Sequence, residues 1–169
     1  IGKEVEPLAN RIKLSWTDEL SFAALLKQAS ALPSHTAIFW ELMIVDAAGV
    51  VHEGDAPLTR LHSVANAPIF SYDESFFGTA VVGGPLLLVA DSSREAAAVS
   101  VRILGGEKPG ETRPPPVQFA SPVFDWREMQ RWGISESRLP PGSKILFRSP
   151  TAWEQYRAYI LTVTAAILI

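Results

Sequence analysis

The sequence contains no cysteine, and this absence limits both its architecture and its chemistry. Disulfide bonds, thiolate metal ligands and cysteine nucleophiles are all excluded. The sequence also lacks a dinucleotide-binding glycine motif, a phosphate-binding Walker loop, a serine nucleophile elbow and a paired-histidine zinc motif. Because these patterns carry many common routes to catalysis, we do not expect this chain to be an enzyme.

An excess of positive charge is also missing. The chain has 15 lysine and arginine residues and 18 aspartate and glutamate residues, which gives a formal net charge of -3. The two signs are scattered along the sequence, so there is no basic stretch to attract a phosphate backbone. We therefore expect no nucleic-acid partner.

Histidine is scarce, and its pattern does not indicate a metal site. The three histidines are His35, His52 and His62, and they lack the spacing of paired ligands on a helix. His52 and Glu53 beside Asp55 form the only local group of possible ligands, and ordinary surface side chains are the simpler interpretation. We expect neither a metal nor a cofactor.

Strand and helix patterns alternate in the first part of this 169-residue chain, whose length suits one domain. We expect strands over 11–16, 36–40 and 68–70, and helices over 22–32 and 56–65. For residues 41–55 we favour a hairpin-like turn, and the alternative is an extension of the strand followed by a turn at Asp46 to Gly49. The first helix has an apolar stripe that Pro33 ends, and Thr17 would cap it with acids in its first turn. The order predicts an α/β fold with a doubly wound parallel sheet.

A third helix is expected after Pro85. Ser92 and Glu95 have the spacing of a capping box, and Gly105 stands where the helix would end. The alanine-rich start of this helix suggests close packing on a sheet. The remaining expected elements are a strand over 117–120, a short helix over 125–132 between an Asp125 cap and Gly133, and an irregular or extended segment over 137–147.

Residues 67–85 form the stretch around which the fold is expected to be organised. The short strand 68–70 breaks into aromatic and acidic residues, and ligands of open α/β sheets lie just outside the carboxyl ends of strands. Glu41 follows the strand 36–40 in the same way, which would bring two strand ends to one cleft. The alternative is that the aromatics belong to the core, the glycines form turns and Glu41 is an exposed acid.

The last residues differ from the rest of the chain. A second capping box, Thr151 to Glu154, precedes a run without charges from Ala158 to Ile169. Because the run is apolar all round and follows aromatic and arginine residues, we favour the start of a membrane-spanning helix, of which about 20 apolar residues would be needed in full. The alternative is an ordinary C-terminal helix packed on the domain.

Four stretches together resemble a known family: ANAPIFSYDESFFGTAVVGG, AAAVSVRILGGEKPGE, FDWREMQRWGISESRLPPGS and FRSPTAWEQYRAYI. They are similar to the extracytoplasmic sensor domains of bacterial histidine kinases whose input region looks like a substrate-binding protein of ABC transporters. The resemblance covers about the last 140 residues. Related sequences tend to have glycine where Ser71 and Ala80 stand here, which implies a differently shaped loop.

The resemblance implies a Rossmann-like lobe of the type I periplasmic binding fold, with a C-terminal helix. Residues 1–124 would be the C-terminal lobe, residues 125–150 the return and juxtamembrane linker, and residues 151–169 the start of a membrane helix. The parent would be anchored in the inner membrane with this part on its periplasmic face. The candidate ligand-binding residues are Glu41, Tyr72, Asp73, Glu74 and Phe76.

On this basis the expected function is the sensing of an unknown small molecule, whose binding closes two lobes and shifts the juxtamembrane segment. Two alternatives remain open. The chain could belong to a solute-binding component of a transporter, although the uncharged tail argues against this. It could also be an interaction module that has lost ligand binding and acts by forming a homodimer or by contacting a separate binding protein.

Overall fold

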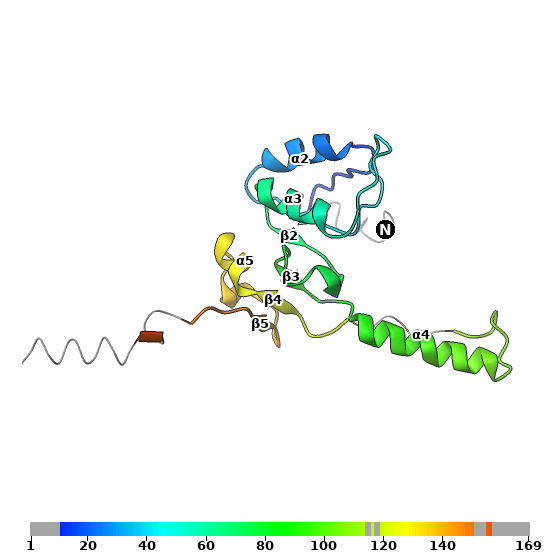
Figure 1. Cartoon of the computed structure of the whole chain (residues 1–169). Helices are drawn as coiled ribbons and strands as arrows, with labels where there is room; N and C mark the ends of the chain where they lie inside the picture. The colour runs from blue at the N-terminus through cyan, green and yellow to red at the C-terminus, as the bar shows by residue number, and fades with distance from the viewer. Residues whose placement is uncertain (1–10, 114–115, 117–118, 151–154, 157–169) are drawn as a thin grey trace, which may run out of the picture. The chain divides into compact units, whose positions relative to one another are not determined.

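The computed structural model describes residues 11–113, 116, 119–150 and 155–156, and these residues have a mixed α/β fold. The chain divides into two compact units, residues 1–67 and 68–169. Each unit has its own buried residues, and each is described separately below. Element labels follow Figure 1.

The first unit contains two packed helices, and both were expected from the sequence. They are α2 (Phe22–Ser30) and α3 (Ala56–Val64), which pack side by side (Figure 1). Asn66 ties their ends together, because its backbone N–H donates to Ala29 O at 3.0 Å and its side-chain amide donates to Leu32 O at 2.8 Å. The buried apolar residues of the helix pair are Leu25, Ala29, Pro57, Leu58 and Leu61.

The start of α2 differs from the prediction. The helix is capped by Ser21, whose Oγ accepts the Ala24 N–H at 3.3 Å, and Thr17 instead begins a turn that Leu20 closes. Residues 11–16 do not form the predicted strand. Alternation of polar and apolar side chains predicts a strand only where a neighbouring strand completes the hydrogen bonds, and these six residues have no ladder.

The strand and the turn expected after α2 are both present. β1 (Ile38–Phe39) falls within the predicted strand 36–40. Further on, Val45 and Val51 form an antiparallel bridge around a turn in which the Gly49 N–H donates to Asp46 O at 2.9 Å. The hairpin-like interpretation of residues 41–55 is thus confirmed.

The second unit contains a small mixed sheet. β3 (Gly83–Gly84) pairs antiparallel with β4 (Val123–Asp125), and β4 pairs parallel with β5 (Lys144–Leu146) (Figure 1). The first strand of this unit is β2 (Ile69–Phe70), as predicted, and Ile69 O accepts the Val82 N–H at 2.8 Å.

The core of the second unit forms where this sheet meets α5 (Trp126–Arg131). Val82, Phe124 and Met129 are buried there. Asp125 caps α5 through its side chain, and Gly133, with φ of 63°, follows its end, so the predicted short helix and both of its boundaries are confirmed. Partly buried side chains surround the core, and these are Phe70, Trp132, Ile134, Leu139 and Ile145.

The longest described helix, α4 (Val89–Leu104), corrects two predictions. It begins at Val89, so Ser92 lies inside the helix rather than at its cap, and no residue of α4 is buried. The predicted close packing of its alanine-rich start is therefore wrong. Its end before Gly105 agrees with the sequence. The predicted strand 117–120 lies partly outside the described residues.

The larger sheet that the sequence predicted is not confirmed. The described strands have two or three residues each, and the second unit's sheet is mixed rather than parallel. Among the helices of the described ranges, none has the length and apolar character needed to cross a membrane. The predicted span over 151–169 lies outside those ranges, apart from residues 155 and 156.

Candidate functional site

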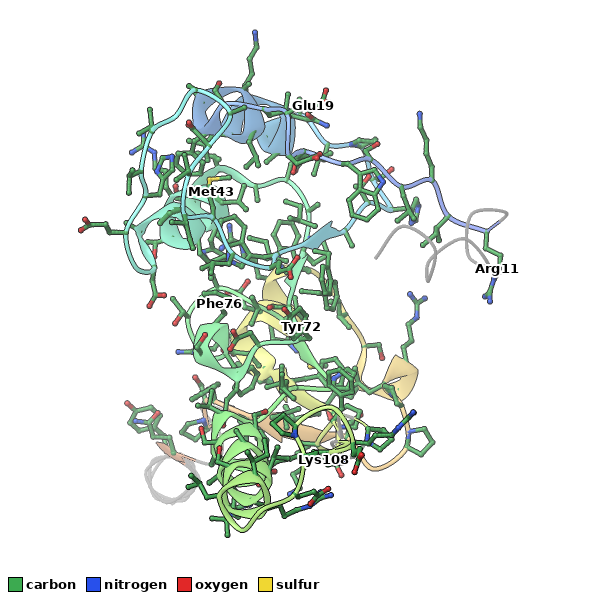
Figure 2. All side chains as sticks on the ribbon, turned by 90° about the vertical axis from the view of Figure 1, so that its right-hand side faces the viewer. Arg11, Glu19, Met43, Tyr72, Phe76 and Lys108 are labelled. Atoms are coloured by element: carbon green, nitrogen blue, oxygen red, sulfur yellow. The ribbon has the colours of Figure 1, made fainter. Side chains whose placement is uncertain are left out.

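The loop that follows β2, residues 71–78, contains most of the predicted site. Its middle forms a single 3-10 turn, η2 (Glu74–Phe76), and it lies entirely in the second unit. Figure 2 labels two of its aromatic side chains, Tyr72 and Phe76. Glu41, by contrast, is an exposed residue of the first unit. The predicted site residues in the loop are Tyr72, Asp73, Glu74 and Phe76.

The two acids of this loop bind backbone groups. Asp73 caps η2, since its Oδ1 accepts the Ser75 N–H at 2.8 Å. Glu74 reaches further along the chain, and its Oε2 accepts the Val89 N–H at 3.0 Å, at the first residue of α4. A carboxylate at a helix N-terminus satisfies an otherwise unpaired donor and complements the helix dipole. Both acids therefore have a structural role.

The aromatic residues of the loop differ in exposure. Phe76 is 5% exposed and is part of the core, as the alternative interpretation of this stretch expected. Tyr72 is half-buried, and its backbone carbonyl accepts the Leu87 N–H at 2.7 Å. Of the four predicted residues in the loop, Tyr72 is thus the aromatic one with surface left for a ligand.

Arg127, which sequence reasoning missed, joins the loop to α5. Its Nε and Nη2 donate to Asp125 Oδ1 at 3.0 Å and Oδ2 at 2.6 Å, and Nη2 also donates to Gly78 O at 2.9 Å. Asp125 has only 1% of its side chain exposed. The hydrogen bonds to Asp125 raise the pKa of the Arg127 guanidinium, so the contact between the two side chains is a charge-assisted ion pair.

The Arg127 guanidinium also contacts an aromatic side chain. The Arg127 guanidinium lies 4.4 Å from the centre of the Phe147 ring, and the Phe77 ring lies 5.5 Å from the Phe147 ring at a tilt of 41°. We call these residues, with Gly78 and Asp125, the Arg127 cluster. The cluster connects the loop, the start of α5 and the residue that follows β5.

The sequence contains signals for single members of this cluster but none for their association. Asp125 was predicted as a helix cap, and the structure agrees. The alternative interpretation of residues 67–85 made their glycines turn residues, and Gly78 has a φ of 85°. Arg127 and Phe147 reach one another because β4 and β5 pair in parallel, with Asp125 opposite Leu146. Such a pairing depends on long-range register, which no local pattern encodes.

His52, the histidine of the possible ligand group, is half-buried and contacts an acid of the hairpin turn. His52 Nε2 lies 3.3 Å from Asp46 Oδ2, and Asp46 also accepts the backbone N–H groups of Phe22, Ala48 and Val50. These hydrogen bonds, above all those from Phe22 and Val50, lower the pKa of Asp46 to about 2. The Asp46 carboxylate therefore holds the hairpin turn against the start of α2.

The described residues contain no group of three acidic or histidine side chains able to hold a metal ion. An open recess of about 510 Å³ lies in the first unit, and Trp16, Asp18, Glu19 and Leu20 line it. Trp16 is 61% exposed, so the recess is open to solvent.

Comparison with known proteins adds no further assignment: no family model, curated protein or solved structure matches this chain.

Proposed function

We propose that this chain belongs to the extracytoplasmic small-molecule sensing module of a membrane-bound histidine kinase. In this proposal the mixed α/β fold is a lobe of the type I periplasmic binding class, and residues 125–150 lead from the lobe towards a membrane helix. The proposal places the parent in the inner membrane with this part on its periplasmic face. The sequence stretches FDWREMQRWGISESRLPPGS and RILGGEKPGE support it.

One observation carries the proposal, namely the direct contact of the 71–78 loop with the segment that follows β5. Arg127 donates to Gly78 O in the loop, and the same guanidinium covers Phe147. Phe147 is the first residue after β5, and the chain continues from it towards the predicted membrane helix. A change in the loop thus has a short physical route to the C-terminal segment.

A ligand can shift such a module only by binding one of its conformations more tightly than the other. Tyr72 supplies a half-buried aromatic surface, and the neighbouring acids Asp73 and Glu74 supply negative charge. This chemistry suits a small molecule with an amine or an aromatic ring. Because Glu74 also supports the start of α4, binding at the loop would alter a helix terminus as well.

A thermal-shift screen tests the proposal. The 169-residue chain and the complete extracytoplasmic segment of the parent are each screened against amino acids, aromatic acids and small polyamines. A ligand present at about 100 times its Kd adds about 2.7 kcal/mol to the stability of the folded state. We expect a hit whose shift is lost in Tyr72→Ala and retained in Tyr156→Ala, a control at a tyrosine that is 49% exposed outside the loop.

The same screen can reject the proposal. If folded samples of both proteins show no shift with any compound, or if Tyr72→Ala and Tyr156→Ala bind equally well, the ligand site is not at this loop. The sensing hypothesis then loses its only candidate site in the described residues.

The apolar surface of α4 favours a second candidate function, an interaction module that forms a homodimer. Val101 and Leu104 are 68% and 87% exposed, and both are large apolar residues. Exposed apolar faces of this kind commonly mark protein contacts. Sedimentation velocity distinguishes this function: a dimer of the chain that Leu104→Lys dissociates and Ala98→Lys leaves intact would support it, and a monomer at all concentrations would reject it.

A further inference from the structure

Phe147 has a backbone conformation that phenylalanine rarely adopts. Its φ is 58°, in the left-handed region, where a side chain crowds the following carbonyl oxygen. A bulky residue stays in this region only when surrounding contacts compensate for the strain, and such positions are frequent at switches. The contacts of the ring must therefore account for the conformation.

Three groups hold the Phe147 ring in place. Arg127 covers it, and Phe77 packs beside it. Gly78 provides the space, because a Cβ atom at this position would lie 3.0 Å from Phe147 Cζ, closer than atoms normally pack. Two of these three groups belong to the 71–78 loop.

The Phe147 ring is only partly buried. Phe147 is 45% exposed, so one side of the ring contacts protein atoms and the other side faces solvent. The following residue, Arg148, makes one ion pair, Nη2 to Glu136 Oε1 at 2.7 Å, and both of these side chains are about half exposed. Exposed ion pairs contribute little stability. Among residues 147–150, Phe147 therefore makes the main contacts with this unit.

We propose that Phe147 is a latch through which the 71–78 loop controls the segment leading to the C-terminus. With the ring seated, the backbone at Phe147 keeps its left-handed turn and fixes the direction in which the chain leaves β5. When the loop moves away from the ring, Phe147 relaxes to an extended conformation and the chain leaves in another direction. The signalling meaning of this latch rests on the proposed function, whereas its operation can be tested without a ligand.

Trypsin cleavage after Arg148 reports the latch, because a protease cuts a segment only when it opens locally. Gly78→Ala places a methyl group against the ring and should release it. Gly84→Ala is the matched control, since Gly84 also has a positive φ but an added Cβ there meets no atom within 4 Å. In the 169-residue chain we expect about tenfold faster cleavage after Arg148 in Gly78→Ala than in Gly84→Ala.

Two further variants test whether the effect passes through the ring. Phe147→Leu should accelerate the same cleavage, because it removes the ring and leaves the loop unchanged. In the double variant Gly78→Ala/Phe147→Leu the acceleration should equal that of Phe147→Leu alone, because the methyl group then has no ring to displace. Cleavage after Arg131, an α5 residue, monitors the integrity of the unit and should not change.

Each cleavage result either supports or overturns the latch. Equal cleavage after Arg148 in Gly78→Ala and Gly84→Ala, with the unit intact, would overturn the latch. If cleavage after Arg131 rises in parallel and shows that Gly78→Ala has unfolded the unit, Phe147→Leu decides: unchanged cleavage after Arg148 overturns the latch, and selective acceleration supports it. A functioning latch with no hit in the ligand screen would reject ligand sensing at the loop and retain the mechanical connection.

Discussion

The guanidinium of Arg127 lies 4.4 Å from the centre of the Phe147 ring while its nitrogens donate to the buried carboxylate of Asp125. The two hydrogen bonds to Asp125 fix the orientation of the guanidinium plane, and the Phe147 ring lies against this oriented guanidinium. One residue thus neutralises a buried acid and holds an aromatic side chain of a different segment. The strength of both contacts can be measured separately.

The first prediction concerns the backbone strain at Phe147. Glycine adopts a φ of 58° without penalty, whereas alanine pays about 1–2 kcal/mol for a left-handed conformation. Both substitutions remove the ring that holds this conformation, so the latch allows either variant to relax to an extended backbone. We therefore expect Phe147→Ala to be at least as stable as Phe147→Gly in urea denaturation followed by tryptophan fluorescence, because alanine then has no left-handed strain and restricts the unfolded chain more than glycine does. A Phe147→Gly variant that is more stable by about 1–2 kcal/mol would show that the left-handed turn persists without the ring, which would contradict the latch.

The second prediction concerns the pair of Arg127 and Asp125. Arg127→Met keeps much of the side-chain volume but leaves the Asp125 carboxylate, 1% exposed, without its charged partner. Such a loss costs about 1–3 kcal/mol, and we expect the free energy of unfolding to fall by this amount. Arg138→Met is the control, because Arg138 is an exposed residue of the same unit. Equal stabilities of the two variants would show that Asp125 does not depend on Arg127.

The sequence predicted those elements whose signals are local. α2 ends before Pro33, α5 begins at an aspartate cap, and the turn at Asp46 precedes a glycine with positive φ. Each of these features depends on residues a few positions apart. Local patterns of the same kind misplaced the start of α4, because the carboxylate that supports its first N–H belongs to Glu74, far upstream in the sequence.

The candidate site shows the same limit. Tyr72, Asp73, Glu74 and Phe76 share a loop because they are neighbours in the sequence, and this much was predictable. The Arg127 cluster was not, since it requires the parallel register of β4 and β5 and the close approach of a ring to Gly78. A glycine in a sequence indicates conformational freedom, but it does not indicate which side chain fills the space.

The third prediction concerns the acid stability of the first unit. The pKa of Asp46 is lowered from 3.8 to about 2, so its carboxylate stabilises the folded state above pH 3.8, and this contribution is lost as the pH falls towards 2. We expect the urea midpoint to fall over this pH range, and to fall less in Asp46→Asn. Asp55→Asn is the control, because Asp55 makes no side-chain cap bond at α3. An identical pH dependence in wild type and Asp46→Asn would refute this role.

The fourth prediction compares the two glycines of β3. A Cβ atom at Gly83 would overlap the backbone carbonyl of Val123 in the paired strand, whereas one at Gly84 would meet open space. Both residues have a positive φ, so the backbone strain of an alanine is similar at the two positions. We expect Gly83→Ala to be less stable than Gly84→Ala by about 1–3 kcal/mol, the usual cost of overpacking. Thermal unfolding monitored by circular dichroism measures the difference, and equal melting temperatures would argue against the β3–β4 pairing.

The fifth prediction separates the two roles given to Glu74, which supports α4 and is a candidate ligand group. Glu74→Gln keeps a side-chain oxygen near the Val89 N–H but removes the charge that complements the helix N-terminus, a change that costs about 0.3–1 kcal/mol. Hydrogen exchange at the first turn of α4 should therefore accelerate by a few-fold, and Asp73→Asn, which changes only the cap of η2, should leave it unchanged.

If Glu74 also binds a cationic ligand, Glu74→Gln must in addition weaken any hit from the screen. Loss of binding without faster exchange would assign Glu74 to the ligand alone, and faster exchange with undiminished binding would remove it from the ligand site.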